Sequence, residues 1–336
     1  MAEALARGTR AAVIVNPSKV DAEALRAAVE QHEQAEGWQP SLWIETTVED
    51  PGSGQVRRAL DEQVALVIAA GGDGTVRAAA AALRDSGVPL AIVPAGTGNL
   101  LARNLELPLG DPAAAVRVAF TGTERAIDLG IIDAERVDGE VDQFVFLVMA
   151  GVGLDAQMVA NTNPQLKAKV GWLAYVDAIA RSLRSGSRVR LRYRLDTNPD
   201  RAMTAHTVLI GNCGMLPGNI ALLPDAEIDD GRLDVVALAP RGFRGWLRIW
   251  SRVVWENGLL RRTQVGRWIV GETKPIRALR YLTGERFIAR FPHPEEFEVD
   301  GDPAGEVVAL RATVDHQALA VMVSAEGTPE EDDVGR

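Results

Sequence analysis

Two glycine-rich segments, each placed directly after a short apolar run, constrain the fold of this chain more than any other feature. The run VALVIAA leads into Gly71–Thr75 (GGDGT), and LAIVP leads into Ala95–Asn99 (AGTGN), with a helical pattern after each segment. Glycine permits positive φ and close backbone approach, and free N–H groups at a helix start attract phosphate. Either segment alone is equally well explained as a tight turn, with Thr75 capping the first helix. Their repetition favours a phosphate-binding site.

The same alternation of apolar runs and helical patterns extends from residue 10 to about residue 105. The expected strands are Ala11–Val15, Ser41–Glu45, Val64–Ala70 and Leu90–Val93. The expected helices are 21–36, 55–62, 76–86 and 100–105. Strands that are apolar throughout and alternate with helices are typical of a parallel sheet covered on both faces. The pattern predicts an α/β, doubly wound nucleotide domain whose ligand lies at the carboxyl ends of the strands, where both glycine-rich segments fall.

Beyond residue 125 the pattern changes to longer alternating segments broken by turn residues. These segments are 143–150, 188–196, 204–211, 233–239, 286–291 and 307–314, with one helical pattern at 171–184. We expect a mostly β, sandwich-like second domain. The predicted boundaries are 1–125 for the first domain and 126–325 for the second, whose last strand can return to the first. Residues 326–336 are predicted to be a disordered acidic tail.

Composition excludes several classes of protein. The chain has 336 residues and a net charge of −10, which disfavours a duplex nucleic-acid binder, since such proteins need clustered basic residues. The single cysteine, Cys213, cannot form an internal disulfide, and the four histidines show no zinc-site spacing. The apolar run near the start is too short for a secretory signal or a membrane span. We therefore expect a cytoplasmic protein, with peripheral attachment to the inner face of the membrane as an option.

The glycine-rich segments match none of the common nucleotide-binding motifs. No Gly-Lys-Ser/Thr sequence occurs, so neither segment is a Walker loop. Arg77 and Leu101 stand where the dinucleotide fingerprint needs its third glycine, and the protein-kinase catalytic loop is missing. A different phosphate-binding class is required.

Taken together, the motifs resemble those of the diacylglycerol kinase catalytic-domain family, which is related to sphingosine kinases and more distantly to NAD kinases and phosphofructokinases. The matching pieces, in collinear order over residues 10 to 324, are Asn16-Pro17, Thr47, GGDGT at 71–75, GTGN at 96–99, IDLG at 127–130, the stretch 224–234 and Asp300-Gly301-Asp302. The resemblance implies an ATP site formed by Asn16, Thr47, Gly71, Gly72, Asp73, Gly74, Thr75, Gly96, Thr97 and Asn99.

The resemblance also implies a Mg²⁺ site in the acidic turn near Asp230. Asp230 would supply a carboxylate, and the main-chain carbonyls of Glu227 and Arg232 would complete the protein ligands. Mg²⁺ prefers such oxygen ligands and retains water. Spacing alone favours a solvated Asp-Gly hairpin turn over a metal site.

The acceptor for the alcohol proton is implied at Asp300 and Asp302, where the family carries a DGE motif. Aspartate at 302 is one carbon shorter than glutamate, which leaves open which carboxylate is the base. Without the family context, the same residues are typical of an exposed turn. Arg77 and Leu100 also depart from the family pattern: Arg77 adds a cation beside the phosphates, and Leu100 removes a carboxylate from an acidic network.

Residues 241–262 form a basic, tryptophan-rich segment. Trp246 and Trp250 share one face of the expected helix, while Arg244 and Arg248 lie on the opposite face. Such a helix suits an anionic membrane surface. The alternative is a helix that packs its apolar stripe on its own protein.

These features predict an ATP- and Mg²⁺-dependent lipid kinase that phosphorylates the hydroxyl of a membrane lipid, diacylglycerol in the first place. Another lipid such as a sphingoid base, an NAD kinase activity and a non-catalytic ATP- or lipid-binding protein are the alternatives. The sequence leaves open whether the chain forms a homo-oligomer.

Overall fold

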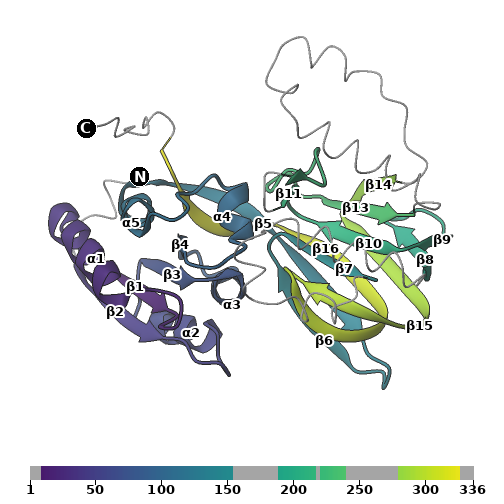
Figure 1. Ribbon diagram of the computed structural model, residues 1–336, viewed down its shortest axis with the longest axis horizontal. Helices are drawn as coiled ribbons and strands as arrows, with labels where there is room; N and C mark the ends of the chain where they lie inside the picture. Colours follow the sequence, from purple (N-terminus) through teal and green to yellow (C-terminus); the bar gives the residue numbers. More distant parts are fainter. Residues whose placement is uncertain (1–8, 154–187, 217–219, 240–278, 326–336) are drawn as a thin grey trace, which may run out of the picture. The chain divides into compact units, whose positions relative to one another are not determined.

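The computed structural model describes residues 9–153, 188–216, 220–239 and 279–325. Contacts between Cα atoms divide the chain into two compact units, Met1–Ile127 with Ala318–Arg336, and Asp128–Gln317. Strands β5 (Thr123–Glu135) and β16 (Asp302–Val323) have residues in both units (Figure 1). The predicted helix at 171–184, the basic segment 241–262 and the acidic tail 326–336 lie outside the described residues.

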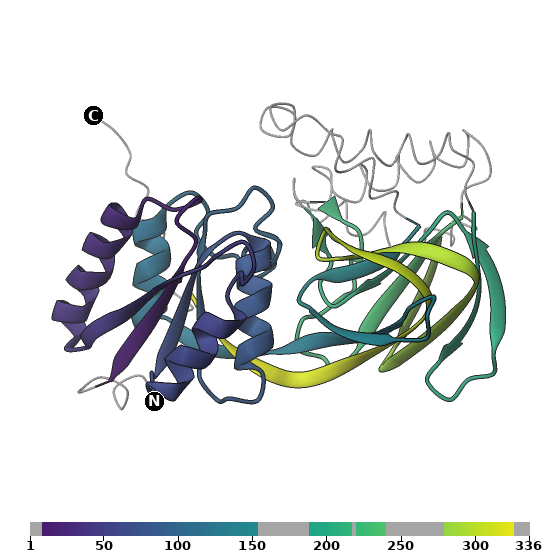
Figure 2. The same cartoon turned by 90° about the horizontal axis from the view of Figure 1, so that it is seen from below.

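The first unit is a parallel sheet with helices on both faces. Its elements are β1 (Arg10–Val15), α1 (Ala22–Glu36), β2 (Gln39–Glu45), α2 (Ser53–Asp61), β3 (Leu66–Gly71), α3 (Asp73–Leu83), β4 (Leu90–Pro94), α4 (Leu100–Asn104) and α5 (Pro112–Thr121). The strand order is β2-β1-β3-β4, followed by the end of β16, and every pair is parallel. Helices α1 and α5 pack on one face, and α2 and α3 cover the other (Figure 2).

Burial explains why the strands of this sheet are apolar throughout. All residues of β3 and β4 are buried, as are Ala11 to Val15 of β1. Alternate residues of β1, such as Val13, join the core under α1 and α5, and the residues between them face the other layer. The predicted doubly wound parallel sheet is confirmed. Helix α5 was not predicted; it begins with Asp111 as N-cap, whose side chain accepts a hydrogen bond from Ala114 N.

The second unit is built of antiparallel strands. They are β6 (Val141–Phe146), β7 (Met149–Val152), β8 (Val189–Leu195), β9 (Arg201–Ala205), β10 (Thr207–Gly211), β11 (Met215–Leu216), β12 (Ile220–Ala221), β13 (Leu233–Leu238), β14 (Leu279–Gly284) and β15 (Arg286–Val299), together with most of β5 and β16. The order is β14-β13-β10-β7-β15-β16, with β8 and β9 attached through β15, and β5 and β6 through β16. Their apolar faces enclose the main core of this unit, in which Phe146, Phe287 and Phe297 are the largest fully buried side chains. Leu209, Leu223, Val236 and Leu238 form a smaller cluster. The predicted β-rich, sandwich-like second domain is confirmed.

Two predicted strands are each divided in the structure. The segment 143–150 is split between β6 and β7 at Leu147 and Val148, and the segment 204–211 is split between β9 and β10 at His206. The segments 286–291 and 307–314 are parts of the much longer β15 and β16. Among the described residues, no helix is long and apolar enough to cross a membrane.

Candidate functional site

The two glycine-rich turns approach each other very closely at the carboxyl ends of β3 and β4. These strands are neighbours in the sheet, and Ala95 N of the second turn donates to Gly71 O of the first at 2.9 Å. A Cβ atom on Gly96 would lie 2.8 Å from Gly72 Cα, which is closer than real Cβ contacts. Gly96 is therefore required by the approach of the two backbones.

Asp73 joins the two turns through its carboxylate. Its Oδ2 accepts a hydrogen bond from Asn99 N at 2.9 Å, and its Oδ1 accepts one from Leu100 N. A Cβ on Gly98 would lie 2.7 Å from Asp73 Oδ2, so this contact also needs a glycine. Asn99 adopts positive φ, and its side chain accepts from Gly96 N at 2.8 Å. Asp73 thus fixes the second turn, a role that the sequence did not indicate.

The start of α3 differs from one expectation. Gly72 is the N-cap and Asp73 is the first helical residue, so Thr75 does not cap the helix. Instead, the Thr75 side chain is buried and lies against Gly71, where an added Cβ would approach it within 2.8 Å. Asp73 at the first turn complements the helix dipole.

The other predicted ATP-binding residues also follow strands of this sheet. Asn16 comes directly after β1, and its N–H donates to Ala70 O at 2.9 Å, which holds it beside the first glycine turn. Thr47 follows β2 and exchanges hydrogen bonds with Asp50 in the loop before α2. Thr97 is exposed in the second turn. Because the strands are parallel, all of these residues lie at one edge of the sheet.

In the second unit, Asp300 and Gly301 form the two-residue loop between β15 and β16. Both have positive φ (48° and 84°), and the flanking residues Val299 and Asp302 are paired. These are the features of a type I′ hairpin turn, for which Asp-Gly is a favoured sequence. The predicted catalytic residues therefore occupy a tight hairpin.

The two aspartates of this hairpin have different surroundings. The Asp300 carboxylate is buried and accepts hydrogen bonds from three consecutive backbone N–H groups, those of Leu147 (3.0 Å), Val148 (2.9 Å) and Met149 (3.0 Å). Asp302, in contrast, is exposed at the first position of β16. Asp300 is thus engaged in holding the segment between β6 and β7, whereas the Asp302 side chain is exposed to solvent.

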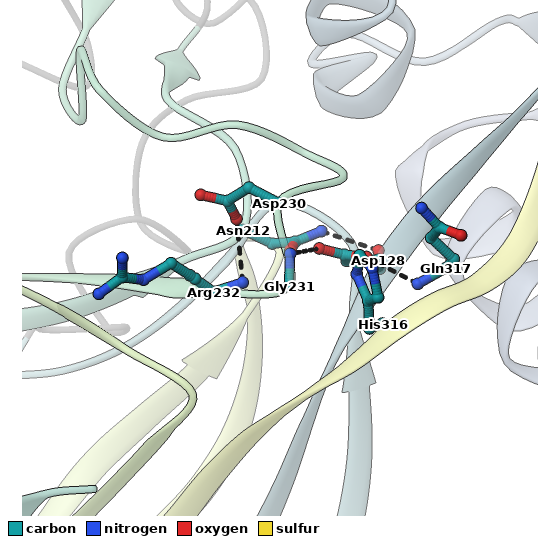
Figure 3. A network of polar contacts seen from close by, with 7 residues as sticks. All are labelled: Asp128, Asn212, Asp230, Gly231, Arg232, His316 and Gln317. Carbon is teal, nitrogen blue, oxygen red and sulfur yellow. Dashed lines mark hydrogen bonds and ion pairs between the residues drawn. The ribbon is translucent and has the colours of Figure 1, made fainter.

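The predicted Mg²⁺ turn precedes β13. Asp230 is exposed, and its Oδ1 accepts from Arg232 N at 2.9 Å, while the other oxygen points away from the other residues labelled in Figure 3. The Ile228 carbonyl accepts from Asp128 N at 2.8 Å. The side chains of Glu227 and Arg232 are exposed. No cluster of three or more metal-ligating side chains occurs among the described residues, so a cation here depends on main-chain carbonyls beside Asp230.

Several carboxylates lie near this turn. Burial raises the pKa of the Asp234 carboxyl, and the charges of Asp230 and Asp225 raise it further, while a hydrogen bond from Thr283 and the charge of Arg232 oppose the shift. Neighbouring carboxylates therefore repel one another at this end of β13. A bound cation would relieve that repulsion.

Asp128, the buried aspartate of β5, fixes the turn from within (Figure 3). Its side chain is fully buried, and Oδ2 accepts from Gly231 N at 2.6 Å. Oδ1 accepts from Gln317 N at 2.7 Å and lies 2.8 Å from His316 Nδ1. The sequence placed Asp128 in a motif but did not predict this role. A single carboxylate inside the apolar run AIDLGII was the available signal.

Asn212 connects Asp128 to the segment that Asp300 holds. Its buried Nδ2 donates to Asp128 O at 2.9 Å and to Leu147 O at 3.2 Å. The Asp230 turn and the hairpin of Asp300 therefore belong to one hydrogen-bonded network within the second unit. Neither Asn212 nor His316 was a candidate from the sequence.

Comparisons with known proteins agree with both units. The model of the diacylglycerol kinase catalytic domain matches residues 10–132, and that of the YegS C-terminal NAD kinase beta sandwich-like domain matches residues 147–323. A probable lipid kinase YegS-like protein of Pseudomonas aeruginosa is 35% identical over 234 residues, which are 67% of this chain and 71% of the relative. A protein of the same name from Stenotrophomonas maltophilia is 34% identical over 67% of this chain and 72% of its own length.

A solved structure shares the fold. It is titled as a diacylglycerol kinase from Bacillus anthracis, and it superposes with a TM-score of 0.64 at 16% identity over 94% of this chain and 97% of its own. The family matches together cover most of the chain, and the named relatives are similar over two thirds of it. The chain therefore belongs to the diacylglycerol kinase catalytic-domain family and, with its YegS-type second domain, to the YegS-like lipid kinases within it.

Proposed function

We propose that this lipid kinase transfers the γ-phosphoryl group of ATP to the free hydroxyl of a membrane lipid, and that diacylglycerol, which becomes phosphatidate, is its substrate. The binding of ATP is supported above all by the close approach of Gly72 and Gly96, whose turns are joined by Asp73. A lipid as the phosphoryl acceptor is supported by the names of the relatives and of the matched family. A nucleotide phosphate placed over the turns would meet backbone N–H groups at the start of α3.

The other ATP contacts follow from the same edge of the sheet. Asn16 is held beside the first turn by its bond to Ala70 O, and the Thr97 hydroxyl is exposed on the second turn. We expect both to contact the nucleotide, together with Thr47 after β2. Asp73 acts by holding Asn99 and its turn in place.

The donors at the acidic turn fit Mg²⁺. They are the Asp230 carboxylate, through the oxygen that does not accept from Arg232 N, and the main-chain carbonyls of Glu227 and Arg232, all of them hard oxygen ligands. Bound there, Mg²⁺ would neutralise charge on the transferring phosphoryl group. Asp128 keeps the turn in shape through Gly231 N.

We assign the proton acceptor to Asp302 and a positioning role to Asp300. General base catalysis needs a carboxylate within hydrogen-bond reach of the substrate hydroxyl, and Asp302 is exposed. The Asp300 carboxylate accepts hydrogen bonds from three backbone N–H groups and so keeps the hairpin that carries Asp302 in position.

The test is phosphorylation of a lipid panel by the purified full chain with Mg²⁺ and radiolabelled ATP. The panel contains diacylglycerol, monoacylglycerol, ceramide and a sphingoid base in neutral detergent micelles, and NAD is assayed in parallel. Labelled phosphatidate is expected, and its formation should fall at least 100-fold in Asp302→Asn. Glu306→Gln, an exposed charge change on the same strand, is the matched control. If every lipid stays unlabelled, the proposed function is wrong; labelled NAD alone would assign the chain an NAD kinase activity instead.

A further inference from the structure

The outer face of β8 carries a row of arginines. Arg190, Arg192 and Arg194 are exposed, and they alternate with Val189, Leu191 and Tyr193, which are buried in the core of the second unit. This alternation follows from the period of two along a strand.

Strand pairing extends this row into a two-dimensional patch. Arg290 of β15 is directly opposite Arg192 of β8. Ile288 is the next residue of β15 on the same face. It lies between Arg194 of β8 and Arg311 of β16, with which it is paired on its two sides. Arg286, two residues before Ile288, shares this face. The arginine face is defined here as Arg190, Arg192, Arg194, Arg286, Arg290 and Arg311.

The charges that strand pairing brings together on this face act on Asp200. The hydrogen bond from Arg194 is the main cause that lowers the pKa of Asp200, and the charges of Arg192 and Arg290 lower it further. Three guanidinium groups from two strands thus act on one carboxylate. The side chains project to the same side of the sheet.

The arginine face carries more positive charge than its neighbours balance. Arg194 pairs with Asp200 and Arg311 with Asp133, but within the described part of the chain Arg192 and Arg290 make no ion pair. Like charges directly opposite each other destabilise a sheet. A chain with a net charge of −10 nevertheless keeps them together. An anionic partner would offset their repulsion.

We propose that the arginine face docks the protein on the anionic surface of a phospholipid bilayer, an inference that rests on the proposed action on a membrane lipid. Residues two apart on a strand are about 7 Å apart and neighbouring strands about 5 Å, so the face presents an open array rather than a pocket. Guanidinium groups bind phosphate in a bidentate manner. Such an array contacts several lipid head groups at once.

The chemistry of the face favours lipid over nucleic acid. Binding of single strands without sequence preference relies on aromatic side chains that stack on bases. The aromatic residue of β8, Tyr193, is directed into the core, and the apolar residue within the arginine face is Ile288, which is half-buried. The described part of the face therefore has charge for phosphates but no stacking platform.

The test is co-sedimentation of the full chain with vesicles of phosphatidylcholine alone or with 30% phosphatidylglycerol. Arg192→Gln with Arg290→Gln should lower partitioning to anionic vesicles about 30-fold, at roughly fivefold for each basic residue near anionic lipid. Both changes remove like charges that face each other, so folding should be preserved. Arg57→Gln with Arg117→Gln, two exposed helical arginines of the first unit, carries the same charge change and should bind like the wild type. Wild-type binding should also weaken as salt increases.

The outcomes separate this inference from the proposed function. In neutral micelles the Arg192 and Arg290 variant should keep its kinase rate, whereas on anionic vesicles its rate should fall with its binding. Failure of the wild type to bind anionic vesicles, or undiminished binding of the variant, would overturn the docking surface whether or not the kinase reaction is found. Tight binding to a single-stranded oligonucleotide without vesicle binding would also overturn it. Vesicle binding that depends on Arg192 and Arg290, in a protein that labels no lipid, would contradict only the proposed reaction.

Discussion

Asp300→Asn and Asp302→Asn should separate stability from catalysis, because the two carboxylates of the hairpin do different work. Asparagine tolerates positive φ, and Asn-Gly is as good a type I′ turn as Asp-Gly, so Asp300→Asn leaves the turn itself intact. What changes is the set of three hydrogen bonds to Leu147, Val148 and Met149. The substitution therefore reports on the carboxylate alone.

The expected cost of Asp300→Asn follows from those bonds. With the amide oxygen placed toward Val148 N and Met149 N, the amide nitrogen faces Leu147 N–H and leaves that donor without an acceptor. An unsatisfied buried donor costs about 1–3 kcal/mol, and the two remaining bonds lose their charge assistance. We expect a loss of about 2–4 kcal/mol in the free energy of unfolding. Asp302→Asn, at an exposed position, should stay within about 0.5 kcal/mol.

Urea denaturation and initial rates of lipid phosphorylation measure the two effects. Asp302→Asn should lose at least 100-fold in kcat with an unchanged urea midpoint. Asp300→Asn should shift the midpoint, and its kcat should fall less than that of Asp302→Asn under conditions where it is folded. If Asp300→Asn keeps wild-type stability yet abolishes kcat, while Asp302→Asn stays active, the assignment of base and positioning residue is reversed.

Three further expectations follow from the described contacts. Gly96→Ala should destabilise the first unit by about 1–3 kcal/mol and weaken ATP binding, measured by calorimetry, because its Cβ would meet Gly72 backbone. Asp234→Asn should increase the free energy of unfolding at neutral pH. The pKa of Asp234 is raised in the folded state, so its charged carboxylate opposes folding, and this destabilisation grows as the pH rises above 3.8. The stabilisation by Asp234→Asn should therefore vanish when unfolding is measured near pH 3. Mg²⁺ should raise the thermal midpoint of the wild type but not of Asp230→Asn; an equal rise in both would contradict the proposed turn.

The first unit was predictable from sequence because its signals are local. Apolar runs of four to seven residues, glycine turns and helical patterns each depend on neighbouring residues, and the strands around Val13 and Ile68 appear where they were expected. In the second unit the break between β6 and β7 arises at Leu147, whose N–H binds Asp300 at a separation of 153 residues. No local pattern contains that information.

The same distinction explains which parts of the site could be found. Gly71–Thr75 and Asp300-Gly301-Asp302 could be proposed from the sequence because each is a contiguous motif. Asn212 and His316 were not, since their roles depend on Asp128, which lies 84 and 188 positions away in the chain. The hydrogen-bond donors to a buried carboxylate are brought to it by the fold and can lie far away in the chain. From the sequence, only the isolated aspartate within an apolar strand indicated a buried polar site.

The network around Asp128 and Asn212 also indicates which part of the proposed reaction each unit organises. Asp128 holds the Asp230 turn, and Asp300 holds the segment 147–149. Asn212 links the two, because it donates to the main-chain carbonyls of Asp128 and Leu147. The positions of the proposed cation turn and of Asp302 are thus set relative to each other by residues of the second unit alone. The two glycine-rich turns are joined in the same way by Asp73 within the first unit. Each half of the proposed reaction is therefore organised by residues of its own unit, and a change in one network should alter either ATP binding or catalysis on the lipid before it alters the other.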